Sequence, residues 1–81
     1  MTEEEIYKQL NEIFEDILEI DNINLTSSTT ADDVEGWDSL AHISLITSIE
    51  RHFKIKFSMN EIVNLHNVGN LVSLIEQKIN N

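Results

Sequence analysis

Three side chains with acid-base or nucleophilic groups, Asp38, Ser39 and His42, fall within one helical turn of the sequence. An acid, a hydroxyl and an imidazole invite a nucleophilic mechanism, but a catalytic triad also needs an oxyanion hole and a substrate pocket held by a larger scaffold. The chain has 81 residues, which suffice for a single domain, residues 1–81, with one modest core. We therefore expect a protein that is not an enzyme and that shares its chemistry with partners.

The same residues also read as the start of a helix. Gly36 permits a turn, Asp38 can accept hydrogen bonds as an N-cap, and an apolar-periodic segment follows. Ser39 then occupies the first helical position, where its hydroxyl lies among backbone N–H groups that have no intrahelical partner. A phosphate attached there would lie at the positive end of the helix dipole. Ser39 is thus either part of a cap or an attachment point.

Metal sites are not expected. The three histidines, His42, His52 and His66, do not have the spacing of a metal-binding pair. The acidic loop before Gly36 fails as an EF-hand, because a sixth-position Gly36 places Ala31 and His42 where carboxylates are needed. No zinc or calcium site follows from the sequence.

Apolar residues at helical spacing predict helices on both sides of a long loop. Thr2 and Glu5 have the form of a capping box that opens the first helix. Periodicity is lost between Asp21 and Trp37, and a loop of that length is usually functional or anchored. The expected anchors in the core are Leu25, Val34 and Trp37.

Three further helices are expected after the loop. The second helix should span Ser39 to Phe53, and the extended connector Lys54–Phe57 should follow it. Ser58 and Glu61 form a second capping box, and Asn67 can cap the last helix. The short third helix is expected to present one face made of Met59, Ile62, Val63 and His66, with Leu65 at its edge. Gly69 in the first turn of the last helix indicates either close packing or fraying.

Charge and composition narrow the range of partners. The formal net charge of −10 disfavours nucleic acid and anionic membranes, whose binding depends on Lys and Arg. There is no cysteine, so any thiol must be borrowed. The acidic N-terminus is unlike a signal peptide, and no apolar run is long enough to insert into a membrane. A cytoplasmic monomer is expected.

The segment Gly-Trp-Asp-Ser-Leu, from Gly36 to Leu40, and the Ala-His-Ile after it resemble the signature of acyl carrier proteins. In that family the serine of an Asp-Ser-Leu element at the start of the second helix receives 4′-phosphopantetheine. The similarity covers nearly the whole chain, including a phenylalanine that ends the second helix, which Phe53 matches. The resemblance implies an all-α, acyl-carrier-like four-helix bundle, with three main helices, a short third helix and a long first loop.

By position, the resemblance makes Ser39 the attachment residue for covalent 4′-phosphopantetheine. Asp38 resembles the aspartate that helps hold Mg²⁺ while a separate phosphopantetheinyl transferase moves the arm from coenzyme A. The chain would carry acyl groups as thioesters on this arm and present them to partner enzymes, namely an acyl- or aminoacyl-activating ligase, an acyltransferase or a synthase. Because the chain lacks cysteine, the arm supplies the only thiol.

The second helix departs from that of the fatty-acid-synthesis members, which resembles an acidic ridge. Here Glu50 is followed by Arg51, His52 and Lys54. Ser44 occupies a position where those members usually carry an acidic residue. We therefore expect a dedicated set of partners.

Trp37 adds a resemblance to stand-alone carriers of specialised pathways, such as polyketide, lipid or surface glycan modification. Two alternatives stay open. One is an aminoacyl or peptidyl carrier. The other is an unmodified acidic helical interaction module, in which Asp38 and Ser39 only cap the helix.

Two groups of residues around the second helix have candidate roles in binding. One polar face suits partner docking or plain solvation, and its residues are Leu40, Ser44, Thr47 and Arg51. A second group could line an acyl cavity or simply pack the core, and it consists of His42, Ile43, Ile46, Ile49 and Ile62. Ile43 and Leu45 are expected to flank the buried face of this helix. One ring nitrogen of His42 is expected to be satisfied by Asp38 or water.

Overall fold

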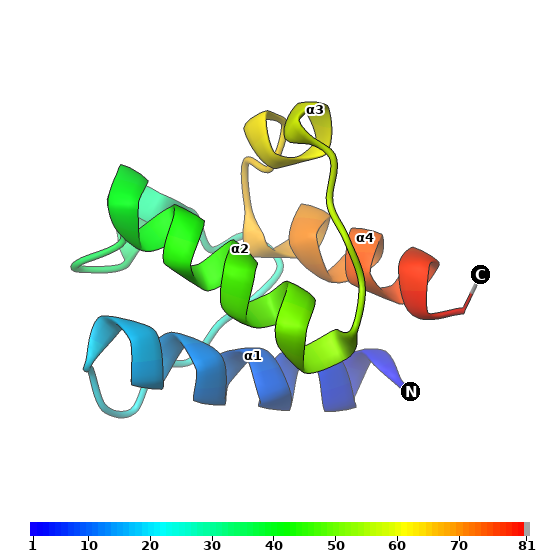
Figure 1. Ribbon diagram of the computed structural model, residues 1–81. Coiled ribbons are helices and arrows are strands. Elements are labelled where there is room, and N and C mark those ends of the chain that lie inside the picture. The colour runs from blue at the N-terminus through cyan, green and yellow to red at the C-terminus, as the bar shows by residue number, and fades with distance from the viewer. Residues whose placement is uncertain (81) are drawn as a thin grey trace.

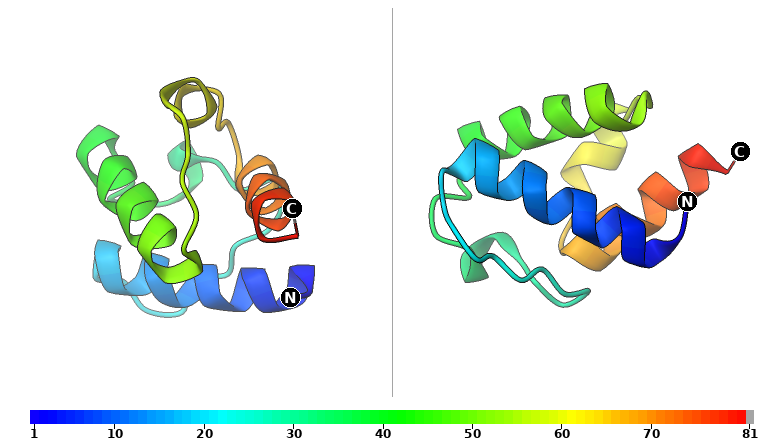
Figure 2. Two further views of the ribbon diagram at one scale, coloured as in Figure 1. Left: turned by 45° about the vertical axis from the view of Figure 1, so that its right-hand side comes forward. Right: turned by 90° about the horizontal axis from the view of Figure 1, so that it is seen from below.

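Four α-helices and one short 3₁₀ helix make up the computed structural model, which describes residues 1–80. The elements are α1 (Glu3–Leu18), the 3₁₀ helix η1 (Ala31–Asp33), α2 (Ser39–Phe53), α3 (Met59–Val63) and α4 (Val68–Ile79). α1 runs beneath α2 and α4, and α3 lies on the other side of that pair (Figures 1 and 2). The predicted all-α four-helix bundle with a short third helix is confirmed. No helix among residues 1–80 combines the length and apolar character needed to cross a membrane.

Each α-helix begins at a polar cap, as predicted. The caps are Thr2, Asp38, Ser58 and Asn67, and each side chain accepts a hydrogen bond from a backbone N–H of the first turn. In α1 and α3 a glutamate side chain also accepts a hydrogen bond from the backbone N–H of the cap residue. These bonds complete the two predicted capping boxes. α3 already ends at Val63, so the prediction of one helical face reaching His66 is wrong. His66 lies instead in the link to α4.

The core lies where α1, α2 and α4 meet, and the loop and the connector each add one side chain to it. Its buried members are Ile6, Leu10, Ile13, Phe14, Leu25, Leu45, Ile46, Ile49, Phe57, Val68, Leu71, Val72 and Ile75. Ile43 was expected beside this core but is 61 % exposed. At 3.6 residues per turn it lies roughly 110° from the middle of the arc formed by Leu45, Ile46 and Ile49, beyond the reach of α1 and α4.

Side chains of α1 hold the first half of the long loop. The N–H of Ile23 donates to Glu15 Oε2 at 3.2 Å, and the N–H of Leu25 donates to Asn11 Oδ1 at 3.1 Å. Leu25 is buried as predicted, and Trp37 packs partly buried against the core. The loop is therefore fixed at several points along its length.

The loop also caps α4. The N–H of Val68 donates to Thr29 O at 2.8 Å, and the N–H of Gly69 donates to Ser27 O at 3.0 Å. Amides in the first turn of a helix have no partner within the helix, so these two carbonyls satisfy donors that would otherwise need water. The close approach explains Gly69, because a Cβ there would lie 2.8 Å from Ser27 O.

We predict that Gly69→Ala destabilises the protein by about 1–3 kcal/mol, the usual cost of overpacking. The loop backbone must move, and this outweighs the gain of up to about 1 kcal/mol that alanine gives over glycine in a helix. Urea unfolding followed by circular dichroism measures the change. Ser73→Ala on the exposed side of α4 is the control and should stay within about 0.5 kcal/mol of the parent. A more stable Gly69→Ala protein would contradict the close-packing explanation.

Two glutamates tie the connector and α3 to the bundle. Glu50 Oε2 accepts from the N–H of Phe57 at 2.8 Å, which fixes the extended connector against the end of α2. Glu61 accepts from the N–H of Ser58 at 2.8 Å and forms an ion pair with Lys78 of α4, with 3.0 Å between Oε1 and Nζ. The Glu61 carboxylate therefore links α3 to α4 through a solvent-accessible ion pair.

Acid should loosen α3. The hydrogen bond from the Ser58 backbone, followed by that from Lys78, lowers the pKa of Glu61 below its ordinary value of 4.5. A lowered pKa means that this stabilisation is complete above pH 4.5 and is lost as the pH falls through the folded-state pKa. Glu61→Gln should therefore be less stable than the parent at neutral pH, and the difference should shrink below pH 4.5. Urea titrations of both proteins across this range measure it, and a difference independent of pH would contradict the prediction.

Candidate functional site

A tight turn followed by the first residue of α2 forms the centre of the site. Gly36 has φ +88°, a backbone conformation that residues with a side chain rarely adopt. This agrees with the prediction that Gly36 permits a turn. The N–H of Asp38 donates to Gly36 O at 3.1 Å, and Asp38 Oδ1 accepts from the N–H of Ala41 at 2.8 Å. These bonds set the start of α2 at Ser39.

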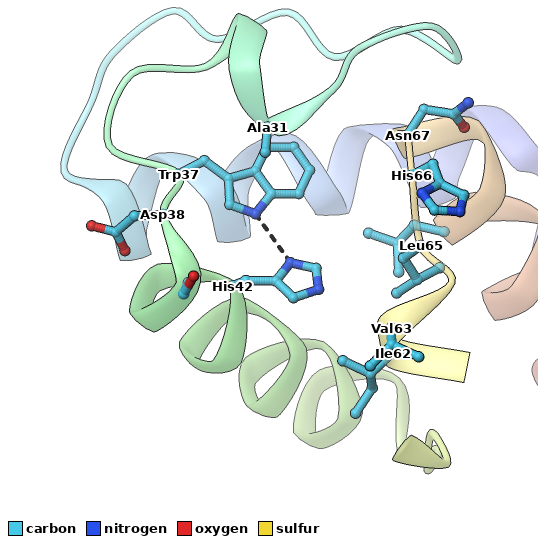
Figure 3. A pocket seen from close by; sticks show the side chains of 11 residues that line it. Ala31, Trp37, Asp38, His42, Ile62, Val63, Leu65, His66 and Asn67 are labelled. Atoms are coloured by element: carbon cyan, nitrogen blue, oxygen red, sulfur yellow. Dashed lines mark hydrogen bonds between the residues drawn. The ribbon is translucent and has the colours of Figure 1, made fainter. Parts of the chain in front are cut away.

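Ser39 is exposed, and its hydroxyl has no hydrogen-bond partner among residues 1–80. The first amides of α2 surround it at the positive end of the helix dipole. A phosphodiester on this oxygen would gain those amides as neighbours without displacing any protein contact, so the residues present fit a phosphate-linked group. The Asp38 carboxylate projects on the outer side of the turn, away from His42 (Figure 3).

His42 has a different partner from the one predicted. Trp37 Nε1 donates to His42 Nδ1 at 3.1 Å, and the two rings stack with centroids 6.0 Å apart (Figure 3). The expectation that Asp38 satisfies a ring nitrogen of His42 is wrong, because the Asp38 carboxylate caps α2 and Nδ1 accepts from Trp37 instead. Trp37 in turn packs edge-on against Phe14 at a centroid distance of 4.9 Å, which connects the site to the core.

An open pocket of about 510 Å³ lies between the start of α2, the loop and the α3–α4 link. Its volume falls in the range of about 300–1,000 Å³ typical of small-molecule sites. The lining residues are Ala31, Trp37, Asp38, Ser39, His42, Ile62, Val63, Leu65, His66, Asn67 and Leu71. Ser39 therefore lies at the edge of a cavity with mixed apolar and polar walls.

The predicted cavity residues do not all meet in this pocket. His42 and Ile62 line it (Figure 3). Ile46 and Ile49 are buried in the core, and Ile43 is exposed on α2. The predicted docking residues are all exposed along α2, and they are Leu40, Ser44, Thr47 and Arg51. Leu40, next to the candidate attachment point, is 78 % exposed.

Sequence reasoning missed the far wall of the pocket. Val63, Leu65, His66 and Asn67 line it from α3 and the link that follows. Helical periodicity had placed three of them along a longer α3. The sequence signal for this wall is Asn67. Because Asn67 caps α4, a helix cannot continue through it, and the residues just before it, Leu65 and His66, belong to a short link that can face α2.

Within the described residues, no group of three or more histidine, aspartate or glutamate side chains is arranged to hold a metal ion. Asp38 is therefore an isolated carboxylate beside the Ser39 hydroxyl. Any metal that acts at this turn would need further ligands from the reacting group or from a partner.

Comparison with known proteins agrees with this geometry. A family model described as a phosphopantetheine attachment site matches residues 8–75. The acyl carrier protein of Petrotoga mobilis is 29% identical over 80 residues, covering 99% of this chain and 94% of the relative. That of Thermotoga maritima is 30% identical over 76 residues, covering 94% of each chain.

A solution structure of a holo acyl carrier protein from Geobacter metallireducens superimposes with a TM-score of 0.86 at 43% identity. The match covers 91% of this chain and 85% of that one. The family's cofactor is covalently attached phosphopantetheine, and its members are carriers and not enzymes. By fold, by the matched range and by its full-length relatives, this chain belongs to the phosphopantetheine-attachment family of acyl carrier proteins.

Proposed function

We propose that Ser39 is the residue to which phosphopantetheine is attached. The observation that carries this proposal is an exposed, unbonded hydroxyl at the first position of α2, on the edge of a pocket large enough for part of a flexible arm. In the transfer the Ser39 oxygen bonds to the phosphorus that bears the pantetheine of coenzyme A. The bond from that phosphorus to the nucleotide's phosphate breaks, adenosine bisphosphate leaves and the hydroxyl proton is lost. Asp38, next to the acceptor, would help hold the Mg²⁺ that a phosphopantetheinyl transferase brings.

The loaded protein carries an acyl group as a thioester and presents it to successive enzymes. Its partners are the transferase that installs the arm and an activating ligase, acyltransferase or synthase that uses it. The docking face consists of Leu40, Ser44, Thr47 and Arg51, which are all exposed and which, at 3.6 residues per turn, lie opposite the buried residues of α2. Leu40 and Ile43 are both exposed and lie three residues apart on α2, so together they give this part of the helix a small apolar contact area.

A specialised pathway fits this face better than general fatty-acid synthesis. Arg51 and His52 close α2 and Lys54 follows, so the end of the helix is basic although the chain carries a net charge of −10. A partner selected for this helix must match a mixed charge pattern and not a uniformly acidic one. If the general malonyl transferase and ketosynthase used the loaded protein as efficiently as their own carrier, the specialised role would be wrong.

Intact mass spectrometry tests the attachment. The protein is incubated with coenzyme A, Mg²⁺ and a broad-specificity phosphopantetheinyl transferase, and fragmentation then locates the modified residue. We expect a single phosphopantetheine increment on the fragment that contains Ser39. An increment on Ser44 or Ser58 would overturn the site, and no increment would favour an unmodified interaction module.

A further inference from the structure

The imidazole of His42 offers the pocket a hydrogen-bond donor whose direction is fixed. Indole Nε1 can only donate, so the 3.1 Å bond from Trp37 requires His42 Nδ1 to accept. A neutral ring then carries its proton on Nε2. Within residues 1–80, Nε2 has no hydrogen-bond partner, and in Figure 3 it points from α2 toward Ile62 and Leu65 across the pocket.

The core holds this arrangement in place. Trp37 stacks on His42 with 23° between the ring planes, and Phe14, which is fully buried, contacts the indole edge-on. Rotation of the imidazole would break the bond to Trp37 and part the stacked rings. Trp37 is therefore a positioning residue for the free N–H of His42.

The residues opposite His42 determine which kind of chain the pocket binds best. Ile62, Val63 and Leu65 present apolar groups on that side. A saturated hydrocarbon in the pocket would exclude water from Nε2–H and give no hydrogen bond in return, which is unfavourable for any polar group. A chain with a carbonyl oxygen at this point would pair with the donor while its carbons contact the apolar wall.

We propose that His42 Nε2–H, oriented by Trp37, is the donor for a carbonyl oxygen of the chain carried on Ser39. The pocket is therefore selective for an oxygen-bearing segment over plain hydrocarbon. This inference rests on the proposed attachment at Ser39, which borders the same pocket. The carbonyl belongs either to an amide of the arm or to the acyl group, and the two sources can be separated.

The test uses three chains installed by the transferase, from coenzyme A, hexanoyl-coenzyme A and 3-oxohexanoyl-coenzyme A. Intact mass confirms each loading, so a failure of attachment is seen separately from a failure of this inference. Long-range ¹H–¹⁵N correlations of the imidazole, recorded at about pH 8, above the ordinary titration range of histidine, report both ring nitrogens. The unmodified protein should show the Nε2–H form of His42.

The Nε2 signal is expected to move when the carbonyl binds. If the Nε2 signal already moves when the arm ends in a free thiol, the acceptor is in the arm. If it first moves with both acyl chains, the acceptor is the thioester carbonyl. If it moves only with the 3-oxo chain, the acceptor is the 3-oxo group of the cargo. A proton on Nδ1 in the unmodified protein, or an Nε2 signal that none of the three chains moves, overturns the proposal.

Variants separate hydrogen bonding from packing. His42→Phe keeps an aromatic ring but removes the donor. Where the acceptor is the 3-oxo group, the cargo should leave the pocket more readily, and cleavage of its thioester by hydroxylamine should accelerate about three- to tenfold, the range for one hydrogen bond. His52→Phe is the matched control, because His52 bonds Gln9 outside the pocket, and it should leave the cleavage rate unchanged. Trp37→Phe should keep the fold yet give a mixture of His42 tautomers, which a purely structural role for Trp37 would not produce. If the Nε2 signal moves only with the 3-oxo chain, equal cleavage rates for His42→Phe and the parent would contradict the proposal.

Discussion

Ser39→Ala is expected to abolish phosphopantetheine attachment while the fold stays intact. The hydroxyl oxygen is the atom that would form the new bond to phosphorus, and alanine has no replacement for it. Ser39 is exposed and its hydroxyl forms no hydrogen bond within residues 1–80, so the substitution removes none. Alanine is also the best helix former, so the free energy of unfolding should stay within about 0.5 kcal/mol of the parent. Intact mass after incubation with the transferase measures the loss.

Asp38→Ala is the informative companion to Ser39→Ala. It leaves the acceptor hydroxyl in place but removes the bond to the N–H of Ala41, and the loss of an N-cap costs about 0.5–2 kcal/mol. Transfer should slow without disappearing, and the unfolding midpoint should fall. If phosphopantetheine were attached to the Ser39→Ala protein as fast as to the parent, another hydroxyl would be the acceptor.

Phe14→Ala is expected to cost about 3–5 kcal/mol, the range for deleting a buried aromatic ring. Phe14 is fully buried on α1 and is among the largest enclosed side chains of the core. A domain of 81 residues has a total stability of roughly 4–12 kcal/mol, so this one change removes a large part of it. Urea unfolding followed by circular dichroism measures the loss.

The same substitution should disturb the site, because the Phe14 ring supports Trp37 at a centroid distance of 4.9 Å. Trp37 is the only tryptophan, so its fluorescence reports the site directly and should change in the folded Phe14→Ala protein. Phe53→Ala is the control, because Phe53 lies at the opposite end of α2 and is only partly buried. It should cost less and leave the fluorescence unchanged. A loss below about 1 kcal/mol for Phe14→Ala would mean that the core closes over the cavity.

Local signals predicted the helices well. Capping residues are short-range features, and Thr2, Asp38, Ser58 and Asn67 each mark a helix start that the structure reproduces. The end of α2 at Phe53 also agrees, with Lys54 in the left-handed conformation at φ 58°. Such features depend on residues a few positions apart, which a sequence displays directly.

Features that depend on the packing of distant segments were not accessible in the same way. The 3₁₀ helix Ala31–Asp33 has no apolar periodicity and was not predicted. The Trp37–His42 bond requires the loop to fold back over α2, which neither residue reveals alone. Ile43 follows the apolar pattern of α2 but lies on the side that α1 and α4 leave open. The candidate site was found from its motif, whereas its pocket emerged only from the arrangement of three segments.

The two hydrogen bonds from α4 to the long loop have a consequence for exchange with solvent. Amides in the first turn of a helix usually exchange quickly, since nothing within the helix protects them. Here the N–H groups of Val68 and Gly69 are held by Thr29 and Ser27. Their deuterium uptake therefore measures how often the loop detaches, and a slow rate at these two amides would make the start of α4 a reporter on a segment some forty residues earlier in the chain.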